Sequence, residues 1–355
     1  MSGRLAGMTS CALPRIRVGD PGELIETIPY LLGFHPRESL VLIGLADAAD
    51  GSEPQQVQVT VRLDLPEPPT AGLDVGALRP LSDVLRRADS QAMAAVLVTD
   101  SVRGDPRESG ELLACRDLLS LAMAEAGIDV LDVLVATERR WWSLCCQQLD
   151  CCPGAGRERR LGSSAAAAQA TFAGLVALPD RQAMAATLAG RDAEQRSRLR
   201  PLLAEAERSQ ARRSQADATP EPAADRRWAQ VSALLAAMAQ PLAELTSEQL
   251  VAHAVALTDP AVRDALWLAI DEGSASAGRL MTELHTRLPP PYDAAPLFLF
   301  GWSQWRAGNA TLAMMAAERV LESQPGYSAA LLLATAAQRG LDPRTVPALR
   351  QGRSS

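Results

Sequence analysis

Four of the six cysteines in this 355-residue chain lie in one short run, Cys145-Cys146-x4-Cys151-Cys152-Pro153. Thiolates with such spacing can chelate a soft metal, so Cys146, Cys151 and Cys152 are candidate ligands and zinc is the candidate cofactor. Zinc sites usually combine two separated ligand pairs, and Cys115 and the three histidines are isolated in the sequence. The run could equally form a labile disulfide, a vicinal redox pair or a reduced structural turn, and all of these readings stay open.

A second group of polar residues occurs at the ends of expected strands. Arg62 and Asp64 lie two positions apart on one strand, so both side chains point to the same face. Asp100 directly follows a continuous apolar strand. In α/β sheets, ligands gather at the carboxyl ends of the strands. These three residues could therefore bind an anion, a metal or a polar ligand, although surface ion pairing explains them as well.

The most distinctive motif runs from Ile28 to Pro36, Ile-Pro-Tyr-Leu-Leu-Gly-Phe-His-Pro. Tyr30 and His35 could stand at the lip of a pocket, with Gly33 allowing a close backbone approach. The favoured interpretation is structural: Gly33 ends a helix and Pro36 forces the chain into an extended segment.

Residues 1–160 are expected to form an α/β domain with a mixed sheet covered by helices. Apolar runs and strict alternation predict strands at 39–45, 57–65, 94–99, 128–136 and 140–144. The first two, separated by a loop rich in Gly, Asp and Pro, predict a hairpin. Amphipathic spacing predicts helices at 73–88 and 108–126.

Residues 161–355 show almost no strand pattern and are expected to form an all-helical domain. Near its end, Gly301, Gly308, Ala313 and Pro325 lie at offsets 0, 7, 12 and 24. This spacing resembles one tetratricopeptide unit at about 294–327, in which small residues let two helices approach closely. We find no clean second copy, so the spacing predicts a helical hairpin more firmly than a peptide-binding array.

Composition excludes several mechanisms. The chain has no lysine, so all 35 basic residues are arginine. A Walker-type phosphate loop, a Schiff-base enzyme and a protein kinase each require a lysine. Residues 1–160 carry 16 arginines against 23 acidic residues, which disfavours a nucleic-acid partner. We recognise neither a signal peptide nor an apolar run long enough for a membrane helix, so a cytoplasmic protein without a membrane partner is expected.

The opening motif, from Pro29 to Val41, resembles an actinobacterial family of uncharacterised proteins known as domain of unknown function 4192. Further agreement comes from Arg62-x-Asp64-Leu65-Pro66, Val98-x-Asp100, Arg140-Trp141-Trp142-Ser143, the cysteine run, Trp305-Arg306-x-Gly308-Asn309 and Pro325-x-Tyr327. The resemblance spans nearly the whole chain and implies no established activity, substrate or cofactor. The family pattern has a glycine two or three residues after Cys-Cys-Pro, and in this chain Gly154 and Gly156 bracket that position.

The leading functional hypothesis is a non-catalytic interaction or regulatory protein, with a protein partner bound by the helical domain. A first alternative is a ligand-binding or hydrolytic α/β domain that uses Tyr30, His35, Arg62, Asp64 and Asp100. A second alternative is a metal or redox module built on the cysteine run.

Overall fold

The structure, a computed structural model, describes residues 20–47, 56–71, 74–160, 162, 164–172, 175–216, 221–239, 245–271, 277–343 and 345–347. The chain forms two compact units, Met1–Arg181 and Gln182–Ser355. The first extends about twenty residues beyond the domain expected to end at residue 160, because helix α4 (Ala165–Phe172) packs against helix α1 (Pro21–Leu32).

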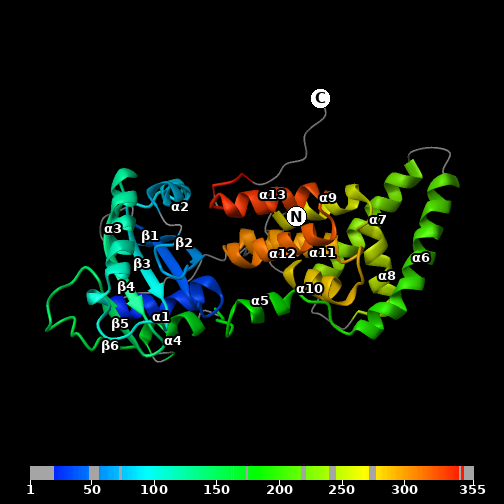
Figure 1. Ribbon diagram of the computed structural model, residues 1–355. Helices are drawn as coiled ribbons and strands as arrows, with labels where there is room; N and C mark the ends of the chain where they lie inside the picture. Colours follow the sequence, from blue (N-terminus) through cyan, green and yellow to red (C-terminus); the bar gives the residue numbers. More distant parts are fainter. Residues whose placement is uncertain are drawn as a thin grey trace, which may run out of the picture. The chain divides into compact units, whose positions relative to one another are not determined.

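The first unit alternates strands and helices, as Figure 1 shows. After α1 come β1 (Ser39–Ala46), β2 (Gln56–Asp64), α2 (Val75–Arg87), β3 (Ala92–Val98), a 3-10 turn (Pro106–Glu108), α3 (Gly110–Glu125), β4 (Asp129–Ala136), β5 (Arg140–Ser143), β6 (Arg157–Glu158) and α4. Helix α5 (Arg181–Thr187) follows and crosses the boundary into the second unit. The predicted strands and the helices at 73–88 and 108–126 are all found within a few residues of their expected bounds, except that Leu73 lies outside the described residues.

The strands form one mixed sheet in the order β2-β1-β3-β4-β5-β6. Strands β1 and β2 pair antiparallel, which confirms the predicted hairpin, and β3 and β4 pair in parallel across the α3 crossover. Ser39 at the start of β1 pairs with both Asp64 and Val98, and Val98 pairs with Ala136. The carboxyl ends of β2, β3 and β4 therefore meet at one end of the sheet.

Helices cover both faces of this sheet. Leu78 and Leu85 of α2, and Leu119 of α3, share one fully buried cluster with Leu42 and Leu97 of the sheet. On the other face, α1 lies against Trp141, because a Cβ added at Gly22 would come within 3.0 Å of the indole nitrogen. The alternation of Trp141 and Trp142 along β5 therefore sends one indole to each face.

Local sequence explains how α1 begins and ends. The carboxylate of Asp20 accepts a hydrogen bond from the backbone N–H of Glu23 at 3.0 Å, which caps the first turn. Gly33 ends the helix with φ 82°, a left-handed conformation that costs glycine nothing. Gly33 therefore ends the helix as predicted, and β1 begins at Ser39 after a short segment without regular structure.

After α5, all the regular elements described in the second unit are helices. Its helices are α6 (Ala193–Ala216), α7 (Glu221–Ala239), α8 (Ser247–Ala256), α9 (Pro260–Asp271), α10 (Ala277–Arg287), α11 (Ala294–Arg306), α12 (Ala310–Ser323) and α13 (Ser328–Gln338). Helices α9 and α11 pack together through edge-to-face contacts of Trp267 with Phe298 and Trp302. Asp271 accepts hydrogen bonds from Trp302 and Arg306 at the same interface.

An α/β unit followed by a helical unit is the fold that the sequence predicts. Helices α11 and α12 occupy the expected hairpin at 294–327. Along the chain from α10 to α13, consecutive helices pack against one another. The tetratricopeptide-like character of this hairpin stays a prediction. None of the described helices combines the length and apolarity that a membrane crossing requires.

Candidate functional site

Arg62 and Asp64 lie at the sheet end where the strand termini meet. Their side chains form an ion pair at 2.6 Å, and the Nε of Arg62 donates to the hydroxyl of Ser39 at 2.9 Å. The Ser39 hydroxyl in turn donates to the carbonyl oxygen of Arg37 at 2.6 Å. The guanidinium of Arg62 is thus bound by Asp64 on the same strand and by Ser39 on the neighbouring strand β1.

Glu38 ties three strand ends together at the same place. Its carboxylate accepts hydrogen bonds from the Thr99 hydroxyl at 2.7 Å and the Asp100 backbone N–H at 3.1 Å. Its carbonyl oxygen accepts from the N–H of Leu65 at 2.9 Å. Glu38 has φ 36°, a left-handed conformation that is unfavourable for a residue with a side chain. The sequence offers no signal for this residue, because its role depends on that conformation.

Among the described residues, neither Tyr30 nor His35 makes a hydrogen bond or ion pair with Arg62, Asp64 or Asp100. The Tyr30 hydroxyl is 3.5 Å from the hydroxyl of Thr171, which belongs to α4. Partial burial and the charges of Arg159 and Arg37 lower the pKa of His35, and the carboxylate of Glu26 opposes them. Glu26 and Arg159 form a buried ion pair at 3.0 Å. The charges that act on the His35 imidazole are therefore not those of Asp64 and Asp100.

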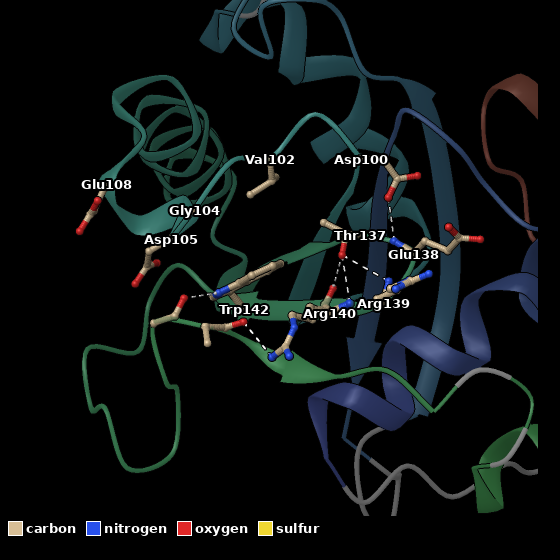
Figure 2. A pocket seen from close by; sticks show the side chains of 12 residues that line it. Asp100, Val102, Gly104, Asp105, Glu108, Thr137, Glu138, Arg139, Arg140 and Trp142 are labelled. Atoms are coloured by element: carbon tan, nitrogen blue, oxygen red, sulfur yellow. Dashed lines mark hydrogen bonds between the residues drawn. The ribbon is translucent and has the colours of Figure 1, made fainter.

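An open hollow of about 850 Å³ lies at the carboxyl ends of β3 and β4, shown in Figure 2. Of the five residues that the sequence proposes as ligand contacts, Asp100 alone lines it. Asp100 accepts a hydrogen bond from the N–H of Glu138 at 2.7 Å, which joins the loop after β3 to the turn between β4 and β5. Arg62, Asp64 and Asp100 therefore lie at the same end of the sheet, but the five candidates do not line one common cavity.

Trp142 lines the hollow (Figure 2), together with Gly154 and Ala155 of the loop after β5. The indole N–H donates to the carbonyl oxygen of Gly154 at 3.0 Å. Arg140 donates to the carbonyl oxygens of Ala155 and Gly156, both at 3.0 Å. Gly156 has φ 75°, and a Cβ there would come within 2.4 Å of the indole. Both the backbone conformation and the close contact require glycine at this position.

The same loop brings the cysteines together. The Sγ atoms of Cys146 and Cys151 lie 3.0 Å apart, and those of Cys151 and Cys152 lie 3.7 Å apart. All three side chains are partly exposed, and the Sγ atoms of the three lie within 4.8 Å of one another. Cys145 is exposed and does not join the cluster, and Cys115 is a fully buried residue of α3. The structure thus brings together the three cysteines that the sequence singles out.

Arg107 fixes this loop from the side of the hollow. One Nη atom donates to the carbonyl oxygens of Cys146 at 3.3 Å and Cys152 at 2.9 Å. The Nε and the other Nη donate to the carboxylate of Asp105 at 2.9 and 2.6 Å, and Asp105 lines the hollow. The N–H of Cys146 also donates to the Ser143 hydroxyl at 2.9 Å. Arg107 therefore holds the loop at both Cys146 and Cys152.

The thiols differ in acidity. Hydrogen bonds from Cys151, from the Gln148 backbone and from Cys152 lower the pKa of Cys146. Desolvation and the neighbouring sulfurs raise the pKa of Cys152 to about 12. Burial alone raises the pKa of Cys115 to about 11. Of these three, Cys146 is the cysteine most readily converted to the nucleophilic thiolate.

Zinc fits this cluster poorly. Two thiolates bound to one tetrahedral zinc at about 2.3 Å would lie about 3.8 Å apart. Cys151 and Cys152 meet that spacing, but the 3.0 Å separation of Cys146 and Cys151 is much shorter. No histidine or carboxylate among the described residues joins the three sulfurs within the same radius. The donor geometry favours a covalent sulfur–sulfur bond over a shared metal ion.

A search of curated proteins and a search of solved structures each gave no match to this chain. One family model does match, and it covers residues 21–344, which include every strand, the hollow, the cysteine loop and all the helices described above. The chain therefore belongs to the family described as a domain of unknown function, DUF4192.

Proposed function

We propose that this protein is a non-catalytic, cytoplasmic regulatory protein whose N-terminal unit carries a reversible thiol–disulfide site made by Cys146 and Cys151. The observation that carries the proposal is the 3.0 Å separation of their Sγ atoms, on side chains that small thiol reagents can reach. Cysteines that react reversibly in the reducing cytoplasm are usually redox-sensing or catalytic.

The reaction is a thiol–disulfide exchange with a low-molecular-weight disulfide, RSSR. The Cys146 thiolate attacks one sulfur of RSSR, forms a mixed disulfide and expels RS⁻. Cys151 loses its proton to solvent and attacks the Cys146 sulfur, which closes the protein disulfide and expels the second RS⁻. The two thiolates that leave take up the two protons, so two electrons pass from the protein to RSSR. Excess reduced thiol reverses both steps.

The position of the pair supports a regulatory role. The loop that holds the two sulfurs also forms the wall of the hollow, through Gly154 and Ala155. A disulfide between Cys146 and Cys151 would reduce the number of conformations accessible to this loop. The redox state of the pair would therefore set how rigid the wall is.

The proposal includes a protein partner for the helical unit. Helices that stack in sequence present extended surfaces for binding, and α13 leaves Leu331 and Leu332 about half exposed, at 48% and 53%. The redox site and the partner site are separate parts of the proposal, and the first can be tested alone.

The test is peptide mapping of the oxidised protein. The reduced chain is treated with oxidised glutathione, alkylated, digested without reduction and analysed by mass spectrometry. We expect one disulfide-linked product that joins Cys146 to Cys151, and its loss after treatment with dithiothreitol. Cys145→Ser is the matched control, because it removes an exposed thiol from the same loop and leaves the pair intact.

Two outcomes would overturn the proposal. One is a stable glutathione adduct on Cys146 that never resolves to an internal disulfide. The other is one equivalent of zinc that purifies with the reduced protein and disappears in Cys146→Ser, since a metal would then occupy the sulfurs.

A further inference from the structure

A second hollow, of about 660 Å³, lies within the helical unit. One side is a single face of α6 that carries Arg196, Ser197 and Arg200. The opposite side is formed by the turn before α11, with Asp293, and by the end of α12, with Arg319. Three guanidinium groups therefore line it, against the carboxylates of Asp293 and the exposed Glu322.

The arginines are not equally engaged. Arg196 donates to the carbonyl oxygen of Leu288 at 2.9 Å and lies 3.6 Å from the Asp293 carboxylate, so it holds the turn in place. Arg200 makes one long hydrogen bond, 3.5 Å, to the carbonyl oxygen of Pro290. Arg319 is partly buried, and its guanidinium makes no hydrogen bond or ion pair within the described part of the chain. Arg200 and Arg319 thus retain donors that an anion could use.

Asp293 is the counterpart of these donors. One of its carboxylate oxygens is buried without a hydrogen-bond partner among the described residues, and the other is the one nearest Arg196. Although it stands at the start of α11, its side chain makes no capping hydrogen bond. A carboxylate in a hollow lined by arginines repels a bare anion but accepts a hydrogen bond from a ligand hydroxyl.

We propose that this hollow binds a protonated oxyanion such as hydrogen phosphate. Arg200 and Arg319 donate to the ligand's unprotonated oxygens, and the ligand's hydroxyl donates to Asp293. Arg196 is a positioning residue that fixes the turn and the carboxylate. Burial raises the pKa of Asp293, and the charges of the three arginines oppose this rise. The same groups that face the ligand therefore influence the protonation of the carboxyl.

The proposal predicts discrimination between phosphate and sulfate. The two anions have similar size and geometry, but at about pH 8 phosphate carries one hydroxyl and sulfate carries none. Hydrogen bonds to charged groups contribute about 1.5–3 kcal/mol, which corresponds to at least about tenfold in affinity. We therefore expect phosphate to bind at least about tenfold more tightly than sulfate at equal ionic strength.

The test is isothermal titration calorimetry of the full chain with sodium phosphate and with sodium sulfate. Arg319→Gln should weaken phosphate binding at least about tenfold. Asp293→Asn should reduce or reverse the preference for phosphate, because an amide can donate to sulfate. Arg212→Gln is the matched control, since it removes the same charge from an exposed position of α6 outside the hollow.

Equal affinities for the two anions would overturn the proposal, as would phosphate binding that Arg319→Gln leaves unchanged. Binding that does not saturate would show general attraction to arginine and would also overturn it. Circular dichroism of each variant verifies that the helical unit has folded, and Arg319→Lys provides a variant that retains the charge if the glutamine variant is unstable.

Discussion

Arg107 donates a hydrogen bond to the carbonyl oxygen of Cys152 at 2.9 Å, across 45 positions of sequence. The same guanidinium binds Asp105, whose side chain lines the hollow at the ends of β3 and β4. One side chain therefore connects the cysteine loop to the loop after β3, and this connection gives the first prediction.

Replacing Arg107 with glutamine should loosen the cysteine loop. The change removes charge-assisted bonds to Asp105 and both loop carbonyls, and we expect a loss of about 1–3 kcal/mol in the free energy of unfolding. The internal disulfide should also form more slowly, because Cys146 and Cys151 would no longer be held together. Chemical denaturation and the rate of thiol loss measure the two effects.

Arg103→Gln is the control for this experiment. Arg103 is exposed in the same loop and bonds only to the nearby carbonyls of Asp100 and Val102 in the described structure. If Arg103→Gln and Arg107→Gln slow disulfide formation equally, Arg107 does not position the pair.

Glu38→Gln should weaken the end of the sheet where β1, β2 and β3 meet. The amide retains one acceptor oxygen but loses the charge that strengthens the bonds from Thr99 and Asp100. We expect a loss of about 1 kcal/mol in stability and faster hydrogen exchange at the Asp100 amide. Glu67→Gln, a change of the same type beyond the end of β2, should leave both unchanged.

His285 should make the helical unit sensitive to acid. The imidazole is buried against Phe300, and burial, together with the charges of Arg319 and Arg191, lowers its pKa to about 4. A pKa lowered in the folded state means that the unfolded chain binds the proton first. Stability from this group is therefore present above the ordinary pKa of about 6.5 and is lost as the pH falls from there toward 4.

The measurable effect is a slope of stability against pH. His285 should contribute a loss of about 3 kcal/mol between pH 6.5 and pH 4. His285→Leu should remove this part of the slope, whereas the part due to His253, whose pKa burial also lowers, should persist. An unchanged slope in His285→Leu would show that the imidazole does not resist protonation in the folded unit.

The sequence predicts the elements of this fold well, because each one has a local pattern. Val57 to Leu65 alternates strictly, and the structure places β2 there as an edge strand with one covered face. Strand β6, with two residues, has no pattern of its own and depends on pairing with β5. Helix α4 packs on α1 in the first unit, and its own sequence gives no indication of this contact.

The candidate site is less accessible to sequence reasoning, because it depends on contacts between distant residues. Asp100 could be found from its place after a strand, and the cysteines could be found from their spacing. Arg107 could not, since only the folded chain brings it to Cys146 and Cys152. The position of His35 relative to the strand ends could not be predicted either, because the charges that act on it include that of Arg159, which comes from a distant part of the sequence.

The central claim is that Cys146 and Cys151 form the reversible pair, and Cys152 lies close enough to substitute for either. The most direct measurement is therefore a redox titration in glutathione buffers of four chains: wild type, Cys152→Ser, and the double variants Cys146→Ser/Cys152→Ser and Cys151→Ser/Cys152→Ser. We predict one two-electron transition in the wild type that Cys152→Ser retains and the other two variants lose. Loss of the transition in Cys152→Ser, or its retention in either double variant, would contradict the assignment of the pair.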